Sequence, residues 1–367
     1  MSRSADIVIV GAGMAGASLA AEVAGAGRVV ILESEDHPGY HSTGRSAAFW
    51  SESYGGPAVQ PLTSASGPYL DAGGFLRRRG AVHIAGAEAE KAIRQLQAEF
   101  GGAVRLERLG RDRLAQRIPG LRAGWEIGLD EPTCSDIDVA ALHAHYLAMA
   151  RHKGAELLTR AGLRGAIRQG GGGWTLDTEA GPIRAGLLVN AAGAWADRVA
   201  AAAGIAPIRI QPYRRTVVQL RVDPPAPAEL PLVVDALGRF YFKPEAGGRI
   251  WLSPHDETPM EPCDCAAEEI DVALAIDRLH QVVDWRVERV EHRWAGLRSF
   301  APDRRPVYGF APGRSDFFWF AGQGGFGIQT APAAAKLAAA LLLGEARDAM
   351  VAGIDGGLYS PARFGGQ

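Results

Sequence analysis

The sequence predicts an α/β protein of two interleaved domains, one built on a parallel sheet and the other, of the α+β kind, on an antiparallel sheet. Three observations lead to this prediction. With 367 residues, the chain exceeds the length at which a single hydrophobic core is usual. It begins with a strand, a glycine-rich turn, a helix and a second strand. Two later strands, which end near residues 190 and 321, each run into a loop of small residues.

Composition favours a small molecule as the partner. Hydrophobic residues make up 47% of the chain, and the formal net charge of -2 provides no broad basic field for nucleic acid or an anionic membrane. The apolar segment 7–27 is interrupted by glycines and Glu22, so we expect neither a signal peptide nor an integral membrane segment. Three cysteines suit a reducing, cytoplasmic location and form neither a disulfide framework nor a metal site: Cys134, Cys263 and Cys265.

The first motif is a G-x-G-x-x-G turn between predicted strands at 6–10 and 28–32, with a helix that ends near Val23. Its glycines permit the tight turn, the approach of a pyrophosphate and the packing of helix on strand, in the order Gly11, Gly13 and Gly16. Glu33 follows the second strand and would accept hydrogen bonds from an adenosine ribose. The motif predicts a Rossmann-like dinucleotide site, and by itself it fits NAD as well as FAD.

The middle of the chain continues with a helix and short strands. Asp138 is placed to cap a helix that closes near Gly154. A strand from 184 then stops at the small residues 190–193. Small residues here suggest that the backbone passes close to another group, either a ligand or a packed helix. The intervening strands are expected at 155–159, 163–169 and 174–179.

A second glycine loop lies near the C-terminus. A strand at 318–321 precedes the loop 322–330, and an alanine-rich helix follows to about Leu343. Free N–H groups and the positive end of a helix dipole meet in such a loop. Two helix N-termini of this kind suit a ligand with two separated negative features. FAD has both, in its pyrophosphate and in the flavin ring.

Over almost its whole length, the chain resembles the FAD-dependent D-amino acid oxidase, glycine oxidase and sarcosine oxidase family. Within that family it is most similar to the branch of bacterial D-arginine dehydrogenase and related D-amino acid dehydrogenases. The resemblance lies in seven stretches in matching order: VIVGAGMAGASLA, GYHSTGRSAA, VNAAGAWAD, QPYRRTVV, FYFKPEAG, HRWAGLRSFAPD and AGQGGFGIQT. It implies FAD as the cofactor, held non-covalently because no cysteine lies near the C-terminal glycine loop.

The motifs and the resemblance together imply which residues hold FAD. In the polar loop, residues 39–50, small residues would let backbone N–H groups meet the flavin, and Ser46 or Arg45 would reach the phosphates. The implied residues are Gly11, Gly13, Ala15, Gly16 and Glu33 from the first motif; Ser42, Thr43, Gly44, Arg45, Ser46, Ala47 and Ala48 from the polar loop; Ala192, Gly193 and Trp195; and Gly324, Gly325, Gly327, Ile328, Gln329 and Thr330.

The resemblance implies hydride transfer from Cα of an amino acid to flavin N5, which gives an imine that hydrolyses to a 2-oxo acid and ammonia. The protein must then hold the carboxylate and aim the C–H bond. Arg215 and Arg298 match the positions that clamp the carboxylate, for which guanidinium is suited. Arg214 alternates to the other strand face and is expected to be structural. The other implied site residues are Tyr54 and Tyr241 as donors to the carboxylate, Gly325 and Gln329 in the C-terminal loop, Phe49 beside the substrate, and Lys243 near the flavin.

Two positions depart from the D-arginine branch. Gly80 stands where that branch has the glutamate that binds a guanidinium side chain, and Phe49 stands in place of a histidine. A cationic side chain would lose its partner, so neutral or hydrophobic D-amino acids are the expected substrates. The three consecutive arginines at 77–79 leave open the alternative of a substrate with an acidic side chain, although such a run is more often a solvated face. His41 is expected to be scaffold, because an ammonium group can lose its proton to water.

The leading hypothesis is therefore an FAD-dependent D-amino acid dehydrogenase or oxidase. An oxidase of N-methyl or cyclic secondary amino acids, similar to sarcosine or glycine oxidase, needs the same carboxylate clamp and remains the alternative. An NAD-dependent dehydrogenase and a non-enzymatic flavoprotein are less favoured. The sequence does not distinguish oxygen from a quinone as electron acceptor. The FAD-binding domain is expected at 1–75, 139–210 and 299–367, and the substrate domain at 76–138 and 211–298.

Overall fold

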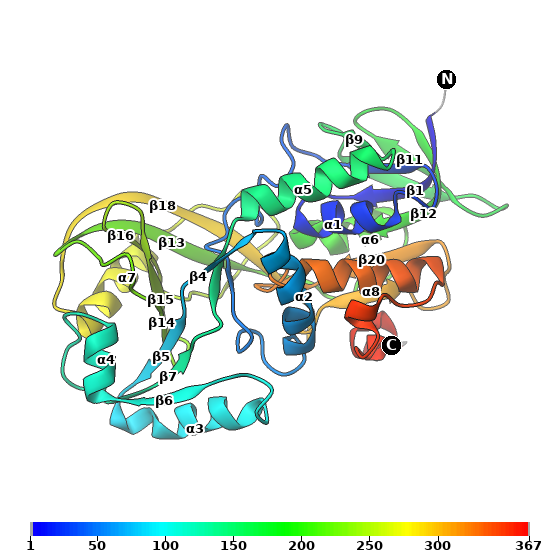
Figure 1. Cartoon of the computed structure of the whole chain (residues 1–367). Coiled ribbons are helices and arrows are strands. Elements are labelled where there is room, and N and C mark those ends of the chain that lie inside the picture. The colour runs from blue at the N-terminus through cyan, green and yellow to red at the C-terminus, as the bar shows by residue number, and fades with distance from the viewer. Residues whose placement is uncertain (1–2, 366–367) are drawn as a thin grey trace.

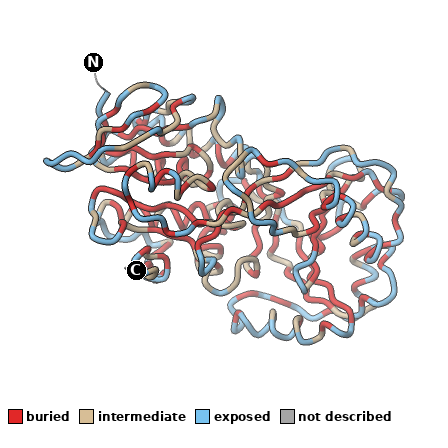
Figure 2. Tube along the Cα trace, turned by 180° about the vertical axis from the view of Figure 1, so that it is seen from behind, coloured by how far each residue is buried: buried red, intermediate tan, exposed pale blue. Residues whose placement is uncertain are grey.

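A computed structural model describes residues 3–365 and shows two halves, each organised around its own sheet (Figure 1). The helices are α1 (Met14–Val23), α2 (Gln60–Ala72), α3 (Glu90–Glu99), α4 (Arg111–Arg117), α5 (Val139–His152), α6 (Ala196–Ala202), α7 (Glu269–Val282) and α8 (Ala331–Leu343). Buried segments run through the middle of both halves, and exposed segments surround them (Figure 2).

The first half contains an eight-stranded sheet with a parallel centre. Its path is β10-β11-β12-β1-β2-β9, with β20 paired to β12 and β19 paired to β20. The pairs among β12, β1, β2, β9 and β20 are parallel, whereas β10, β11 and β19 add antiparallel pairs at the edges. The strands are β1 (Arg3–Val10), β2 (Val29–Leu32), β9 (Glu156–Leu158), β10 (Leu163–Arg168), β11 (Trp174–Thr178), β12 (Ile183–Asn190), β19 (Val307–Phe310) and β20 (Phe317–Ala321).

Alternate residues of the parallel strands enter two separate cores. Ile7 and Ile9 of β1 pack in the core that includes helices α1, α5 and α8. Val8 and Val10 point to the opposite face, where α6 and β11 complete a second core. Because both faces are covered, these strands are apolar throughout rather than alternating with polar residues.

The second half contains a ten-stranded sheet along the path β21-β18-β13-β16-β15-β14-β5-β7-β6, with β17 paired to β13. It is antiparallel, as predicted, except that β14 and β5 run parallel. The strands are β5 (Ala81–Ala85), β6 (Glu107–Gly110), β7 (Ile127–Glu131), β13 (Gln211–Asp223), β14 (Leu232–Asp235), β15 (Tyr241–Glu245), β16 (Arg249–Ser253), β17 (Thr258–Pro259), β18 (Arg286–Phe300) and β21 (Gln323–Gly324).

This second sheet also has two different faces. Val218 and Phe242 belong to a core that includes residues of α4 and α7. On the opposite face, Val217 and Tyr241 belong to a smaller cluster with Ala47 of the polar loop. That second face therefore turns toward the parallel half. A small third sheet adjoins it, with the order β3 (Phe49–Trp50), β8 (Ser135–Ile137) and β4 (Leu76–Arg78).

The predicted elements agree with the structure to within a few residues. The helix capped by Asp138 is α5, and the Asp138 carboxylate accepts a hydrogen bond from the N–H of Ala141 at 2.9 Å. All strands of the eight-stranded sheet lie in the three segments assigned to FAD. The ten-stranded sheet lies in the other two, apart from β21 and the end of β18. The domain boundaries themselves stay a prediction.

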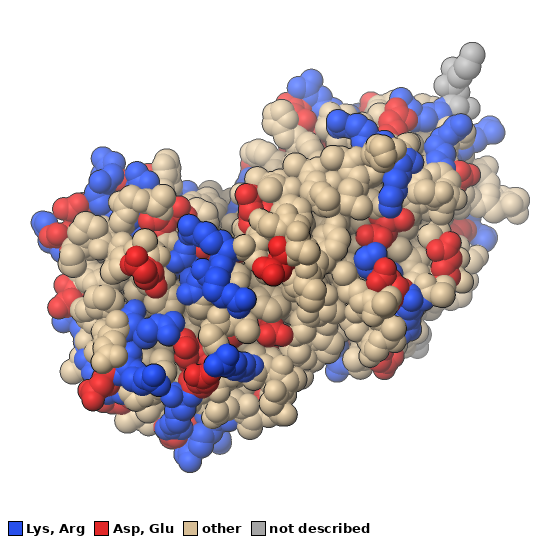
Figure 3. Space-filling view, viewed as in Figure 1, with Lys and Arg blue, Asp and Glu red and all other residues tan. Residues whose placement is uncertain are grey.

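The surface shown in Figure 3 carries acidic and basic side chains interspersed over both halves, which agrees with the net charge of -2. Among residues 3–365, no helix is both long enough and apolar enough to cross a membrane.

Candidate active site

A cavity of about 550 Å³ lies where the carboxyl ends of the parallel strands face the ten-stranded sheet. Ligands of open α/β sheets bind in crevices at this end of the strands. The wall is formed by residues within the segments 10–15, 32–34, 39–47, 161–164, 191–202, 296–299 and 323–328, and by Arg215, Val217 and Tyr241.

The first glycine loop leaves no room for side chains at two positions. Gly11 has a φ of 102°, and a Cβ atom there would lie 2.5 Å from the backbone oxygen of Ala191. A Cβ atom at Gly16 would lie 1.8 Å from the oxygen of Gly11, so Gly16 serves packing and does not line the cavity. Gly13 and Ala15 do line it, at the N-terminus of α1, where free N–H groups favour an anion.

We expect Gly11→Ala to lose FAD. The substitution forces the backbone oxygen of Ala191 away and places alanine at a positive φ, which alone costs more than about 1 kcal/mol. The measurement is the FAD content of the purified protein, from flavin absorbance. Gly25→Ala is the matched control, because a Cβ atom at Gly25 meets nothing within 4 Å. Equal FAD content in both variants would contradict this role for Gly11.

Glu33 lies at the end of β2 and connects three parts of the cavity wall. Its carboxylate accepts hydrogen bonds from the N–H groups of Ala12 and Glu35, both at 3.0 Å. Its backbone oxygen accepts one from Ala161, in the segment 161–164 that borders the cavity. A carboxylate has about four acceptor positions, so capacity for ribose hydroxyl groups remains. The ribose contact itself stays a prediction.

The polar loop ties the two halves of the molecule together. Thr43 accepts a hydrogen bond through Oγ1 from the N–H of Met14, at 2.9 Å, which connects it to the first turn of α1. Ser42 donates through Oγ to the backbone oxygen of Leu297 on β18, at 2.6 Å. Of the loop residues predicted to contact FAD, Ser42, Thr43, Arg45, Ser46 and Ala47 line the cavity, whereas Gly44 and Ala48 do not.

The guanidinium of Arg45 binds protein groups of the second half. It lies 2.5 Å from the carboxylate of Asp264 and donates to the backbone oxygens of Cys265 and Ala295, at 3.1 and 3.2 Å. The expected contact with the phosphates would require these bonds to be given up. Arg45 therefore joins the two halves, although its side chain also forms part of the cavity wall.

The loop after β12 is stabilised by a hydrogen bond between its own residues and by aromatic packing. The side-chain amide of Asn190 donates to the backbone oxygen of Ala196 at 2.7 Å. The ring of Trp195 lies 4.5 Å from that of His41, whose Nε2 is 2.8 Å from the Glu35 carboxylate. His41 also lines the cavity, and its scaffold role stays a prediction. All three predicted residues of this loop line the cavity: Ala192, Gly193 and Trp195.

The C-terminal loop places four of its six predicted residues in the wall: Gly324, Gly325, Gly327 and Ile328. A Cβ atom at Gly325 would lie 2.6 Å from the hydroxyl of Tyr54 and 2.8 Å from Nη1 of Arg298, so a side chain here would displace the ends of these two residues. Gln329 and Thr330 do not line the cavity. Gln329 instead donates to the backbone oxygen of Tyr54 and accepts from the N–H of Ser51, and Thr330 is fully buried. The expected substrate-side position of Gln329 is therefore wrong.

Four polar side chains meet where the ten-stranded sheet borders the cavity. Arg298 donates to the hydroxyl of Tyr54, and Arg215 donates to the backbone oxygen of Asp256 (2.7 Å) and to the Glu257 carboxylate (3.0 Å). Two buried polar atoms of residues that line the cavity have no hydrogen-bond partner within residues 3–365: Nη1 of Arg215 and Oη of Tyr241. Burial and the positive charge of Arg298 lower the pKa of Arg215 to about 10, so it remains a cation at neutral pH.

Arg214 is structural, as expected from strand alternation. It lies on the opposite face of β13 from the cavity and is buried. Its guanidinium forms ion pairs with Glu268 and, at 2.8 Å, with Asp271.

Phe49 and Lys243 lie behind the cavity wall rather than in it. The ring of Phe49 packs against Tyr54 and Tyr241, with centroid distances of 5.2 and 5.8 Å. Lys243 is buried, and its ammonium group lies 2.8 Å from the Asp136 carboxylate. Lys243 therefore has the partner that a buried cation requires, and its expected place near the flavin stays a prediction.

Gly80 and the three arginines at 77–79 do not form part of the cavity wall. Gly80 lies outside the wall, at a positive φ of 77°. Arg77 and Arg78 are exposed, and Arg79 is bound at 2.6 Å to Asp136. None of these three arginines is available to an acidic substrate side chain in the cavity.

His255 lies next to the site, behind Tyr241, and was not predicted from the sequence. Its ring lies 5.8 Å from that of Tyr241. Burial and the positive charges of Arg215 and Arg298 lower its pKa to about 3, so the ring is neutral at physiological pH. It lies in the loop between β16 and β17, and no motif marks it. Cavity residues at the adenosine end were also missed, including Arg164 and Arg198, because no short pattern marks them either.

A glycine-lined cavity that ends in a cluster of arginine and tyrosine side chains is an arrangement expected of a flavin-dependent oxidoreductase. Comparison with known proteins gives the family. The chain belongs to the DAO family, described as FAD dependent oxidoreductase, whose model matches residues 6–341. FAD is thus the cofactor, and the glycine-lined crevice fits it.

Proteins similar to this chain include several amino acid oxidoreductases. It is 28% identical to glycine oxidase from Pseudomonas aeruginosa over 98% of this chain and 99% of that protein. Among solved structures, L-proline dehydrogenase from P. horikoshii matches with a TM-score of 0.83 and 23% identity, covering 99% of this chain and 98% of that one. Glycine oxidase from Geobacillus kaustophilus matches with a TM-score of 0.82 and 23% identity, over 97% and 99% of the two chains. A particular likeness to D-arginine dehydrogenase stays a prediction.

Proposed function

We propose that the protein oxidatively deaminates a D-amino acid with a neutral or hydrophobic side chain. The observation that carries this proposal is the pair of buried donors without a partner in the described chain, Nη1 of Arg215 and Oη of Tyr241, beside the cation Arg298. Buried polar groups in folded proteins are nearly always hydrogen-bonded, so unused donors in a cavity wall indicate a ligand. A carboxylate has the acceptors and the charge to satisfy them.

The chain's own residues would bind and orient the substrate. Arg298 and Arg215 hold the carboxylate, and Tyr241 donates a third hydrogen bond. Asp256 and Glu257 accept from Nε and Nη2 of Arg215, which leaves Nη1 to donate to the substrate carboxylate. When bound, FAD supplies the two-electron oxidant that accepts the hydride from Cα. The resulting imine hydrolyses in water to the 2-oxo acid and ammonia.

No side chain at this end of the cavity is suited to be a general base. His255, with a pKa of about 3, is too weakly basic to hold a proton at neutral pH. The substrate ammonium group would therefore lose its proton to water before the hydride leaves. Phe49, Tyr54 and Phe326 form an aromatic group beside Arg298 that limits the approach of further water.

Charge argues against a basic substrate. Among the described residues that line the cavity, Glu33 is the only acid, and it lies beside the first glycine loop rather than beside the arginines. A cationic side chain would meet Arg215 and Arg298 without a carboxylate to pair with, and an unpaired buried charge is strongly unfavourable.

A second function has support from the full-length similarity to a glycine oxidase. Glycine and N-methyl or cyclic secondary amino acids need the same carboxylate clamp and little room for a side chain. Oxidation of these substrates is therefore our alternative proposal.

We expect D-leucine and D-phenylalanine to reduce the bound flavin at least about 100-fold more efficiently than D-arginine, since an uncompensated buried charge costs about 3 kcal/mol or more. The measurement is the anaerobic loss of flavin absorbance with D-amino acids, their L-enantiomers, glycine, sarcosine and L-proline. Faster reduction by glycine or sarcosine than by D-leucine would favour the alternative. Reduction by D-arginine as fast as by D-leucine would contradict the specificity, and no reduction by any of these compounds would contradict both functions.

A further inference from the structure

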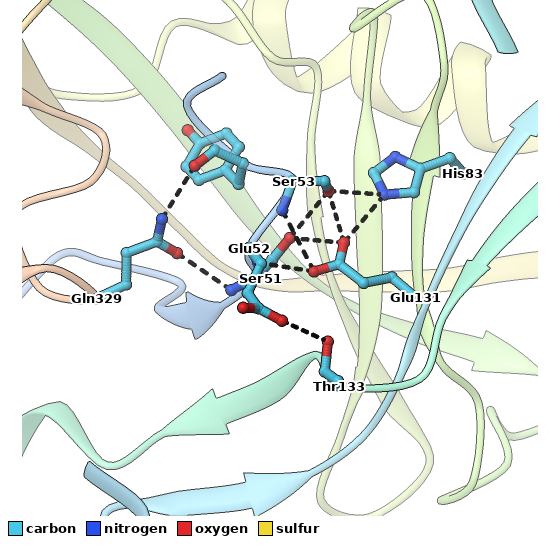
Figure 4. Close-up of polar contacts among 8 residues, drawn as sticks. Ser51, Glu52, Ser53, His83, Glu131, Thr133 and Gln329 are labelled. Atoms are coloured by element: carbon cyan, nitrogen blue, oxygen red, sulfur yellow. Dashed lines mark hydrogen bonds and ion pairs between the residues drawn. The ribbon is translucent and has the colours of Figure 1, made fainter. Parts of the chain in front are cut away.

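A buried polar cluster lies beside the proposed carboxylate site and takes no part in the proposed reaction. Ser51, Ser53, His83 and Glu131 surround one another, and the Glu131 side chain is fully buried (Figure 4). Its Oε2 atom accepts hydrogen bonds from the hydroxyls of Ser51 (2.9 Å) and Ser53 (2.5 Å). Its Oε1 atom accepts from the backbone N–H groups of Glu52 (2.7 Å) and Ser53 (3.4 Å).

The cluster is not a serine nucleophile with its base and orienting acid. In such a triad the serine and the carboxylate bind opposite nitrogens of the histidine ring. Here both Ser53 (3.2 Å) and Glu131 (3.4 Å) approach the same nitrogen, Nε2 of His83. The cluster is also absent from the cavity wall. Its contacts converge instead on the short segment 51–54.

That segment carries Tyr54 and is held from two sides. Glu131, at the end of β7, binds one side through the four hydrogen bonds given above. Gln329 binds the other, because its amide accepts from the N–H of Ser51 (3.2 Å) and donates to the backbone oxygen of Tyr54 (3.0 Å) (Figure 4). Gly55 and Gly56 follow at positive φ angles of 108° and 75°, so no regular structure continues the segment.

We propose that Glu131 is a positioning residue, which holds segment 51–54 so that the Tyr54 hydroxyl contacts Arg298 in the geometry that binds the substrate carboxylate. This inference rests on the proposed function, because it takes Arg298 as the carboxylate clamp. Tyr54 accepts a hydrogen bond from Arg298, and its ring is fixed between Phe49 (5.2 Å) and Phe326 (5.1 Å). A small displacement of its backbone would therefore move the hydroxyl off Arg298.

An ionised carboxylate suits this role better than a neutral amide. A carboxylate accepts at both oxygens and so binds two N–H and two O–H donors at once, whereas the glutamine amide presents one acceptor oxygen. Burial raises the pKa of Glu131, but hydrogen bonds from His83, Ser53 and Ser51 more than offset this and lower it below its ordinary value. Glu131→Gln therefore keeps the shape of the side chain and removes about half of its acceptor capacity.

The test is a double-mutant cycle of Glu131→Gln with Tyr54→Phe in the FAD-bound enzyme. The probes are acetate, whose affinity is followed by perturbation of the flavin spectrum, and D-leucine, in anaerobic reduction. We expect Glu131→Gln to weaken both affinities about tenfold while FAD content and the limiting reduction rate change little. In the Tyr54→Phe background the same substitution should have no further effect, because coupled residues are non-additive.

Three further variants keep the outcome decisive. Glu291→Gln is the matched control, since Glu291 is another ion-paired carboxylate with a side chain only 7% exposed, and it lies on the outer part of β18. Ser53→Ala, which removes the 2.5 Å bond to Glu131, serves if Glu131→Gln fails to fold, with the same expected loss of affinity and the same dependence on Tyr54. Arg298→Met tests the clamp itself.

Unchanged affinity in Glu131→Gln, or an equal loss with and without the Tyr54 hydroxyl, would overturn the positioning role. If Arg298→Met weakens both probes but Glu131→Gln does not, only the positioning role fails. If Arg298→Met has no effect on either probe, the proposed function fails as well.

Discussion

Replacing Arg298 with methionine is expected to raise the KM for the amino acid by about 10²- to 10³-fold, while the protein remains folded with FAD bound. The reason is the loss of the charged partner for the substrate carboxylate in a buried site. Truncating one member of such a hydrogen-bonded charge pair costs about 3–4 kcal/mol, and each 1.4 kcal/mol is a factor of ten. The carboxylate is bound in both the ground state and the transition state, so the loss falls mainly on KM rather than on kcat.

Anaerobic stopped-flow reduction separates the two effects of the Arg298 substitution, since it gives the apparent Kd and the limiting rate of flavin reduction. Arg289→Met is the matched control because Arg289 lies on the same strand and its side chain is 69% exposed. An unchanged apparent Kd in Arg298→Met would place the carboxylate site elsewhere. A loss of FAD from the variant would show that Arg298 acts on the fold.

Much of the fold could be predicted because its signals are local. Gly11 and Gly16 are required by backbone contacts within a short motif, and the buried strands beside them are apolar runs that the sequence shows directly. The parallel pairing of β14 with β5 was not predicted, since it joins residues about 150 positions apart in an otherwise antiparallel sheet. No short sequence pattern encodes such a pairing.

The same limit applies to the site. Arg215, Arg298 and Tyr241 were predicted from short stretches, and the structure brings them to one end of one cavity. Gln329 was placed in the cavity wall and the partner of Lys243 was missed, because a stretch of sequence gives a residue's neighbours along the chain but not its tertiary partners. Their partners, Ser51 and Asp136, lie more than a hundred residues away. His255 was missed for the same reason.

Phe49 can affect substrate specificity without contacting the substrate directly. The sequence reading placed it against the substrate, whereas the structure packs it behind Tyr54 and Tyr241. An apolar ring in this place still excludes charge from the surroundings of the clamp. Its effect on specificity would therefore be indirect, through the two tyrosines.

Asp136→Asn is the second substitution with a large expected effect, and it acts on stability. The Asp136 carboxylate is the shared partner of Lys243 (2.8 Å) and Arg79 (2.6 Å), and both side chains are more than 90% buried. Removing one member of a buried ion pair leaves an uncompensated charge and costs about 3–5 kcal/mol. We therefore expect a clear fall in the urea midpoint, measured at a fixed excess of FAD because bound ligand adds to stability. Combining Asp136→Asn with Lys243→Met should recover part of the lost stability, because the second substitution removes one of the two buried cations left without a partner.

The pH dependence gives an independent check of the same cluster. Burial raises the pKa of Asp136, but Lys243 and Arg79 more than offset this, so its pKa in the folded protein lies below the ordinary value. A carboxyl group with a depressed folded-state pKa stabilises the protein fully above its unfolded-state pKa of about 4, and this stabilisation is lost as the pH falls through the folded-state value. The stability difference between the wild type and Asp136→Asn should therefore be constant from pH 8 to about pH 5 and shrink below about pH 4. A difference that is absent at neutral pH, or that grows as the solution is acidified, would contradict the ion-pair account.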